Sequence, residues 1–192
     1  MERDRFVAAL RGEDPEAARE LVDTCGERLF RSAFLLCGHE ADAKDLVQET
    51  FLQATRSVGR FRGQSSVYTW LHGILLNLTR HYHRDRKRAV FEPVAPESEP
   101  LVEPAPVFSQ ADVNASGSAL REALRQLSDD HREVIVLRYY ENLKIGEIAA
   151  NLGVALGTVK SRLHYAIGEL QRLLPAEMNL FGAEGTDVVK RS

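Results

Sequence analysis

The side chains best suited to chemistry are concentrated in residues 61–88, FRGQSSVYTWLHGILLNLTRHYHRDRKR. A polar loop around Gly63 opens this stretch. A run of cations closes it, comprising Arg80, Arg84, Arg86, Lys87 and Arg88, with His81 and His83 among them. Cations hold a nucleic-acid backbone, and free polar and aromatic groups hold unstacked bases. Taken by itself, the stretch is more simply an amphipathic helix with a solvated basic end, but the segments on either side favour nucleic-acid binding.

Helices must position these groups, because apolar residues recur at near-helical spacing after the loop. They are Trp70, Leu71, Ile74, Leu75 and Leu78. A short helix is expected from residue 2 to about residue 11. A longer one starts at Pro15, with Asp14 as its N-cap, and stops at Gly38. A third is expected from Glu40 to about Val58.

The helix expected from Glu40 has two different faces. Its buried face comprises Ala43, Leu46, Val47, Phe51 and Ala54, and its other face is a polar, mostly acidic strip of Asp42, Asp45, Gln48 and Glu49. Charge is also segregated along the chain, since residues 50–88 carry 8 Lys and Arg against 1 Asp, while the whole chain has a net charge of −3. A near-neutral total is therefore compatible with a local cationic surface that binds phosphates.

Residues 89–118 differ in composition from the helical domain predicted for residues 1–88. They hold five of the seven prolines and five acidic residues, with no Lys or Arg. Proline blocks helix propagation and biases its neighbours to extended backbone. We therefore predict a flexible Pro/Glu-rich linker, which acts either as a plain tether or as an acidic segment that lies in a cationic channel.

Helical patterns return in residues 119–175, the second predicted domain. A short helix comes first, and a second one, capped by Ser128 or by Asp130, ends at Asn142. Two further helices meet at a turn containing Gly153. Their expected buried residues are Ile145, Ile148, Ala149 and Leu152 in the first and Val159, Leu163, Ala166 and Leu170 in the second. This is the helix-turn-helix arrangement, whose second helix enters a DNA major groove; a plain helical hairpin is the alternative. The tail, residues 176–192, shows no motif.

The bulk composition fits a soluble globular protein, with 44% hydrophobic and 28% charged residues. No apolar run is long enough to span a bilayer, and the charged first residues lack the apolar core of a secretory signal. We therefore expect a cytoplasmic protein without membrane insertion. In a reducing cytosol, Cys25 and Cys37 are expected to be buried thiols rather than a disulfide.

Three stretches, in order, resemble the bacterial RNA polymerase sigma factors of the extracytoplasmic function (ECF) group. They are DAKDLVQETFLQA, FRGQSSVYTWLHGILLNL and LSDDHREVIVLRYYENLKIGEIAANLGVALGTVKSRLHYAIGEL. The resemblance covers residues from about 15 to 174. It implies an all-α protein, with sigma region two in residues 1–88 and sigma region four in residues 119–175. It also implies a protein that binds core RNA polymerase, directs it to promoters, helps open the minus-ten element and has an anti-sigma partner.

The resemblance also implies roles for individual residues. The motif that meets the polymerase clamp is matched by Asp45, Leu46, Gln48 and Glu49. Positions that meet the minus-ten element are matched by Phe61, Arg62, Gly63, Gln64, Ser65, Ser66, Asn77, Arg80, His81 and Arg84. The helix that reads the minus-thirty-five element is matched by Lys160, Ser161, His164 and Tyr165 as base-facing residues and by Thr158 and Arg162 as phosphate contacts.

Some positions depart from the family pattern. His72 and Gly73 stand where an aromatic and a basic residue are common, and Ala155 replaces a frequent proline. His164 and Tyr165 are not the usual pair at their positions. For this reason the promoter sequence that the protein reads does not follow from the resemblance.

Two other classes of protein account for less of the sequence. A stand-alone helix-turn-helix regulator of duplex operators explains residues 128–174 but leaves residues 61–88 unused. A metal-dependent enzyme is disfavoured, because Cys25, Cys37 and His39 lack the spacing of common zinc sites. The sequence also shows no nucleophile motif and no phosphate loop. We therefore expect neither enzymatic activity nor a cofactor.

Overall fold

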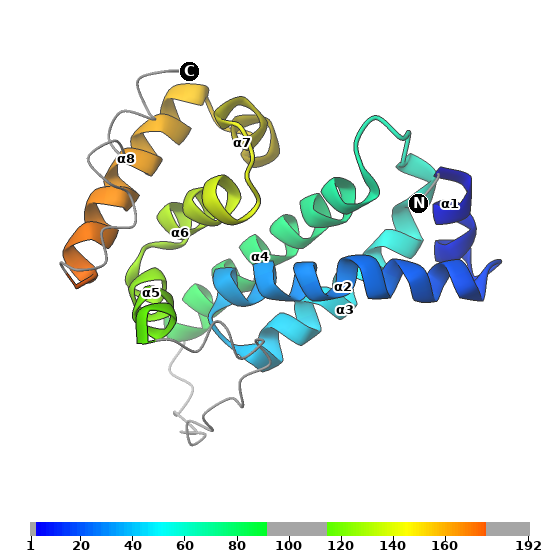
Figure 1. The fold of residues 1–192 in the computed structure, drawn as a ribbon, viewed down its shortest axis with the longest axis horizontal. Coiled ribbons are helices and arrows are strands. Elements are labelled where there is room, and N and C mark those ends of the chain that lie inside the picture. The colour runs from blue at the N-terminus through cyan, green and yellow to red at the C-terminus, as the bar shows by residue number, and fades with distance from the viewer. Residues whose placement is uncertain (1–2, 92–114, 176–192) are drawn as a thin grey trace. The chain divides into compact units, whose positions relative to one another are not determined.

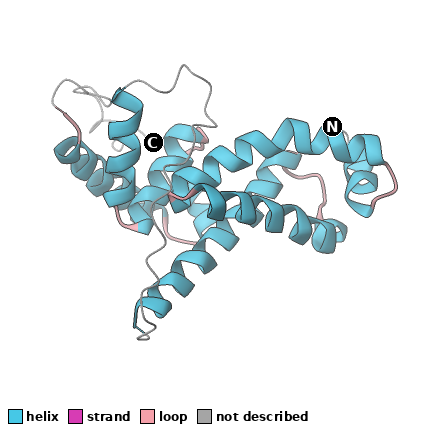
Figure 2. Ribbon diagram, turned by 90° about the horizontal axis from the view of Figure 1, so that it is seen from below, coloured by secondary structure: helices cyan, strands magenta, loops and turns pink. Residues whose placement is uncertain are grey.

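The structure is a computed structural model that describes residues 3–91 and 115–175 (Figure 1). The chain divides into two compact units, Met1–Pro100 and Leu101–Ser192. All the regular secondary structure in the described ranges is helical (Figure 2), which confirms the predicted all-α class. Helices extend into the predicted linker at both ends, up to Phe91 and from Ala115. The rest of the linker and the tail lie outside the described residues.

The first unit is built around three long helices. Within residues 3–91 the elements are α1 (Arg3–Arg11), α2 (Pro15–Cys37), α3 (Glu40–Ser57), the 3₁₀ turn η1 (Val58–Arg60) and α4 (Val67–Phe91). Helices α2, α3 and α4 pack against one another, and α1 packs on α2 (Figure 1). The loop of residues 61–66 therefore joins α3 and its 3₁₀ turn to α4.

Capping side chains and a glycine set the ends of α2 as the sequence predicts. The Asp14 carboxylate accepts a hydrogen bond from the Ala17 amide at 2.9 Å, and Pro15 occupies the first helical position. At the other end Gly38 adopts φ 80°, a left-handed conformation that favours glycine, and its amide donates to the Phe34 carbonyl at 2.8 Å. The tight connection to α3 follows from this stop.

The core of the first unit combines apolar helix faces that spacing predicts on α3 and α4 with residues that it did not predict, among them Phe6 and Phe61. Its buried residues are Phe6, Leu10, Leu21, Cys25, Leu29, Ala33, Cys37, Ala43, Leu46, Ala54, Val58, Phe61, Leu71 and Leu75. Val47 and Phe51 are partly buried at its edge. Cys25 and Cys37 are free and buried, as predicted, and burial raises the pKa of the Cys25 thiol.

The second unit is a smaller helical bundle. Within residues 115–175 its elements are α5 (Ala115–Gln126), α6 (Asp129–Ile135), the π-helical turn η3 (Val136–Tyr140), α7 (Ile145–Leu152) and α8 (Leu156–Leu173). Helix α8 packs on α5, α6 and α7. Val159, Leu163, Ala166 and Leu170 of α8 are all buried, as predicted.

The sequence predicted some of the helix caps and turns of the second unit correctly, but not all of them. Gly153, at φ 65°, ends α7 and makes the turn into α8, so the helix-turn-helix geometry is confirmed. Ser128 caps α6, since its hydroxyl accepts from the His131 amide at 3.3 Å. The alternative cap, Asp130, is wrong because it lies inside the first turn of that helix. The π-helical turn was not predicted; it ends before Asn142, which adopts φ 54°.

Candidate nucleic-acid interface

The loop before α4 is anchored by the ring of Phe61. This side chain is only 4% exposed. Its ring meets Phe6 edge-on, with centroids 4.9 Å apart, and lies 5.4 Å from Trp70. A buried ring cannot stack on a base, so the structure assigns Phe61 to the support of the loop rather than to direct DNA contact. Trp70 packs against the core, as the sequence predicts.

The remaining residues of the loop are exposed. Arg62, Gly63, Gln64 and Ser65 all lie at the surface, and Gly63 adopts φ 71°. Ser66 ends the loop by capping α4, because its hydroxyl accepts from the Thr69 amide at 3.0 Å. The loop is therefore held at both ends, by Phe61 and by Ser66, while the polar groups between them are accessible.

The predicted DNA contacts on α4 lie along one face of the helix. Asn77, His81 and Arg84 are exposed and follow one another at spacings of four and three residues, which places them on adjacent turns of one face. Arg80, which is half-buried, lies beside this row. The Arg84 guanidinium and the His81 ring are hydrogen-bonded to each other. The structure thus brings an amide, an imidazole and two cations together on successive turns of α4.

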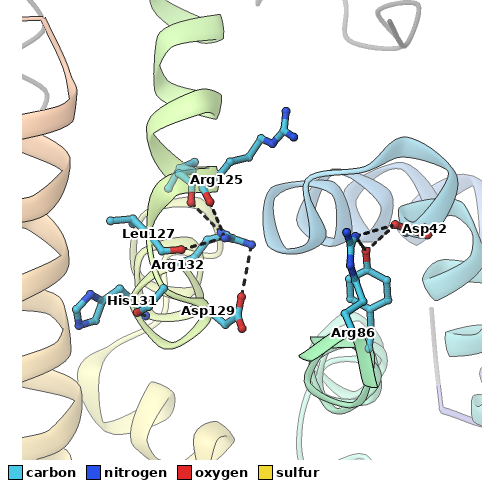
Figure 3. A network of polar contacts seen from close by, with 10 residues as sticks. Asp42, Arg86, Arg125, Leu127, Asp129, His131 and Arg132 are labelled. Atoms are coloured by element: carbon cyan, nitrogen blue, oxygen red, sulfur yellow. Dashed lines mark hydrogen bonds and ion pairs between the residues drawn. The ribbon is translucent and has the colours of Figure 1, made fainter. Parts of the chain in front are cut away.

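One member of the cationic run is turned toward α3 instead. Arg86 donates to the Tyr82 hydroxyl at 2.5 Å and lies 3.7 Å from Asp42 (Figure 3). The Tyr82 hydroxyl itself donates to Asp42 at 2.6 Å. Burial, together with this hydrogen bond, raises the pKa of Tyr82 to about 12. We call these three residues the Asp42 cluster; it ties the start of α3 to the cationic half of α4.

The four α3 residues that match the clamp motif differ in exposure. Asp45 and Gln48 lie at the surface, and Glu49 is partly exposed and pairs with Arg56 at 3.5 Å. Leu46 is only 8% exposed and belongs to the core. It is therefore placed where it can position the strip but has little surface to offer a partner.

A polar connection between α2 and α4 was missed by sequence reasoning. His72 and Ser32, both buried, share a hydrogen bond of 2.8 Å. The His72 ring stacks on Tyr68, and the Arg28 guanidinium lies 4.0 Å from the centroid of the Tyr68 ring. His72 had been noted only as a departure from the family pattern. A partner 40 residues away leaves no signal in the spacing of residues, so packing alone reveals this pair.

The outer face of α8 carries most of the residues predicted to read DNA. Ser161, His164 and Tyr165 are exposed, and the Tyr165 side chain is 65% exposed. Their spacing puts them on the side opposite the buried stripe, and the rings of His164 and Tyr165 meet at 5.6 Å. Thr158 and Lys160 are half-buried at the flanks.

Arg162, a predicted phosphate contact, is engaged within the protein. Its guanidinium lies 2.6 Å from the Asp130 carboxylate of α6. Two turns further along α8, Glu169 lies 3.0 Å from the His131 ring. These two pairs, which we call the α6–α8 bridges, attach one flank of α8 to α6.

Arg132 is a second residue that sequence reasoning missed. Its buried guanidinium donates to the carbonyls of Leu124 at 2.8 Å, Arg125 at 3.0 Å and Leu127 at 3.0 Å (Figure 3). It also lies 3.9 Å from Asp129. Arg132 thereby bonds to carbonyls at and just after the end of α5, of which that of Leu124 also accepts from the Leu127 amide at 3.3 Å, and it fixes α5 to α6.

The described residues also bear on metal binding and on membrane insertion. In residues 3–91 and 115–175, no group of three His, Cys, Asp or Glu side chains is arranged to hold a metal ion. Across the same ranges, every helix is too short or too polar to cross a membrane.

The two units match known families separately. Residues 21–89 match the family model of sigma-70 region 2, and residues 123–172 match that of sigma-70, region 4. The two matches fall on the two units that the fold defines and together define the class, a sigma-70-type transcription factor.

Known relatives define the group within that class. The chain is 37% identical over 157 residues to the ECF RNA polymerase sigma factor SigE of Mycolicibacterium smegmatis, a match that covers 81% of this chain and 60% of SigE. It is 36% identical over 159 residues to the ECF RNA polymerase sigma factor SigL of Mycobacterium tuberculosis, covering 81% of this chain and 88% of SigL.

A solved structure also shows similarity to a sigma factor. The fold is similar to that of the sigma factor RpoE, solved in complex with the anti-sigma factor NepR from Bartonella quintana. The TM-score is 0.64 with 33% sequence identity, and the match covers 81% of this chain and 94% of that chain. This chain belongs to the ECF RNA polymerase sigma factors, as its sequence predicts, and is a promoter-directing initiation factor.

Proposed function

We propose that this sigma factor divides its contacts among three exposed faces. The strip on α3 binds the polymerase clamp, the loop and the row on α4 bind the opened minus-ten element, and the outer face of α8 reads the minus-thirty-five element. The observation that carries this proposal is geometric. On each of the three helices, the proposed contact residues share one solvent-facing side and are exposed or partly exposed, whereas the apolar residues between them are buried or partly buried.

The polymerase contact is electrostatic in this proposal. Asp45 and Glu49 are four residues apart, so they lie on one face of α3 and can pair with basic residues of a partner helix. Gln48 adds a neutral donor and acceptor to the same face. Leu46 contributes by holding the strip against the core. The alternative role for these charges is a solvated helix face with no partner.

The minus-ten contact combines capture of a base with neutralisation of the backbone. Moving a base out of the stack costs about a few kcal/mol, which new contacts must repay. Gln64 and Asn77 carry amides that donate to and accept from base edges, and the exposed loop backbone adds further polar groups. Arg62, Arg80 and Arg84 supply charge for the phosphates.

The upstream contact lies on α8. Ser161, His164 and Tyr165 present hydroxyl, imidazole and phenol groups of the kinds that meet base edges and methyl groups in a major groove. Lys160, on the flank, can reach either a base or a phosphate. Thr158, and Arg162 one helical turn after it, are proposed as phosphate contacts.

The same faces suit an inhibitory partner. The relative RpoE was solved with an anti-sigma factor, and we extend that kind of partner to this chain. A protein that covers the α3 strip would block the polymerase contact. Because its targets are polymerase and chromosomal DNA, we place this protein in the bacterial cytoplasm, acting as a non-enzymatic factor.

The proposal is tested by co-purification with bacterial core RNA polymerase. Reversing the charge of the strip with Asp45→Arg and Glu49→Arg should abolish stable binding that the wild-type chain shows. A matched control is Asp23→Arg with Glu27→Arg, which makes the same charge change at the same four-residue spacing on the exposed side of α2.

Two outcomes decide the matter. Loss of polymerase binding in the α3 variant, with binding retained by the α2 variant, supports the assignment of the strip. Equal loss in both variants would show that only the total charge of the unit matters, and the residue-level assignment would be wrong.

A further inference from the structure

The α6–α8 bridges place a carboxylate beside a residue of the DNA-binding helix. Asp130 lies in the first turn of α6 and is 62% exposed, while Arg162 on α8 is 23% exposed. Their atoms are 2.6 Å apart, which is a short, charge-assisted hydrogen bond. In this structure, the guanidinium that the sequence assigns to a DNA phosphate is therefore already occupied by an anion.

The position of Arg162 on α8 explains how it can exchange partners. It lies on the flank of the helix, between the buried stripe and the outer face that carries Ser161 and Tyr165. Glu169, seven residues further on, lies on the same flank and is held by His131. Of the two bridges, the one formed by Arg162 is nearer the N-terminal end of α8, the end that enters the groove in a helix-turn-helix protein.

We propose that Asp130 is an affinity-determining residue of the DNA interface, an internal competitor for the phosphate contact of Arg162. This inference rests on the proposed function of α8. The contact joins one guanidinium nitrogen, Nη2, to Asp130 Oδ2, and a guanidinium that turns to bind a phosphate through two N–H groups would have to leave it. A pair with an exposed carboxylate is weak and screened by salt, so a phosphate can displace it, at a cost to the affinity for DNA. Asp130 thus restrains binding of the upstream element without touching a base.

Four full-length proteins test the competition: the wild type, Asp130→Asn, Arg162→Gln and the double variant. Each is assembled with core RNA polymerase. The probe is a duplex enriched from a random-sequence pool by the wild-type holoenzyme, and its affinity is measured over a range of salt concentrations. Asn has nearly the shape of Asp, so the first substitution removes the charge while leaving the surface otherwise the same.

Competition between Asp130 and a DNA phosphate predicts the direction in which each substitution changes the affinity for the duplex. Asp130→Asn should tighten binding by about two- to fivefold, the equivalent of one exposed ion pair. It should also steepen the slope of log K against log salt by up to about 0.9, the value for one added phosphate contact. Arg162→Gln should weaken binding and flatten that slope. The double variant should bind like Arg162→Gln, because Asp130 acts only through Arg162.

A neighbouring aspartate provides the matched control. Asp129→Asn removes the same charge one residue away, but Asp129 faces Arg132 rather than Arg162, so its affinity for the duplex should stay within twofold of the wild type. Equal tightening by Asp129→Asn and Asp130→Asn would overturn the proposal in favour of general repulsion between α6 and DNA.

Two further results would also overturn it. Weaker binding by Asp130→Asn would mean that Asp130 orients Arg162 toward the phosphate, and tightening that persists in the Arg162→Gln background would mean that Arg162 is not involved. A wild-type holoenzyme that enriches no duplex would defeat the proposed function itself, and this inference with it.

Discussion

The two units hold an arginine of their proposed DNA-binding helices by the same kind of contact, but with different support. In the first unit Asp42 reaches Arg86 at 3.7 Å, and the Tyr82 hydroxyl bonds to both. In the second unit Asp130 meets its arginine directly at 2.6 Å. Only the first unit adds a partly buried aromatic residue to the pair. The pair in the first unit therefore shares a third, partly buried partner, whereas the pair in the second unit is a direct contact between two charged side chains.

The anchors beneath these contacts differ as well. The first unit fixes the loop of residues 61–66 with a cluster of rings, in which Phe61 is 4% exposed. The second unit fixes its helices with the guanidinium of Arg132, which bonds to three carbonyls. Ring packing depends on volume, whereas the Arg132 contacts depend on matching each carbonyl with a donor. Substitutions that remove volume and substitutions that remove donors should therefore damage different units.

The largest effect is expected from Phe61→Ala. Removing this buried ring should destabilise the first unit by about 3–4 kcal/mol, because the space between Phe6 and Trp70 cannot close completely. Hydrogen exchange measured by mass spectrometry should show faster exchange in α1, α3 and α4 and unchanged exchange in α8.

Phe61→Leu separates packing from base contact. Leucine keeps most of the buried volume, so it should restore much of the stability, and promoter opening by the holoenzyme should be close to that of the wild type. Opening that fails in Phe61→Leu, with the unit folded, would show that the ring itself contacts DNA and would contradict the supporting role derived from its burial.

The next largest effect is expected from Arg132→Met in the second unit. Methionine fills much of the space but donates nothing, so the carbonyls of Arg125 and Leu127 lose this donor, while that of Leu124 keeps the Leu127 amide. We expect a loss of about 2–3 kcal/mol. Hydrogen exchange should increase in α5 and α6, with the first unit unchanged, which is the reverse of the pattern for Phe61→Ala.

Arg125→Met is the matched control for this substitution. Arg125 is 49% exposed and its partner Glu122 lies 3.8 Å away on the same helix, so its loss should cost about 0.5 kcal/mol or less. Similar exchange in the two variants would mean that the three carbonyl contacts of Arg132 contribute little to stability.

These anchors mark the boundary of what the sequence could predict. Helices, their caps and their buried faces are local, so periodicity and the signals at Asp14, Gly38 and Gly153 predicted them correctly. The exposed residues of the DNA-facing rows followed from the family resemblance. Contacts between helices did not follow. From the sequence alone, a phenylalanine in a polar loop suggests a free ring, and an arginine in a helix suggests a solvated cation. Their burial depends on neighbouring elements, whose positions the sequence does not give.

The smallest effect on stability is expected at the Asp42 cluster, and it tests the contrast between the two units most specifically. Tyr82→Phe removes a hydroxyl that donates to Asp42 and accepts from Arg86, and it should cost about 1 kcal/mol at neutral pH. In the folded state the pKa of Tyr82 is raised from 10 to about 12. The neutral hydroxyl is therefore the stabilised form, and its contribution is full below pH 10 and is lost as the pH rises toward 12.

We would measure the free energy of unfolding in urea for the wild type and for Tyr82→Phe over a range of pH. The difference between the two free energies should be constant near neutral pH and shrink above about pH 10. Tyr165→Phe, which removes an exposed hydroxyl from the second unit, serves as the control and should show no such convergence. If the difference in the free energy of unfolding between the wild type and Tyr82→Phe stays unchanged to high pH, the hydroxyl does not hold Asp42 in solution. The first unit would then hold Arg86 only as loosely as a surface pair, and the contrast between the two units would disappear.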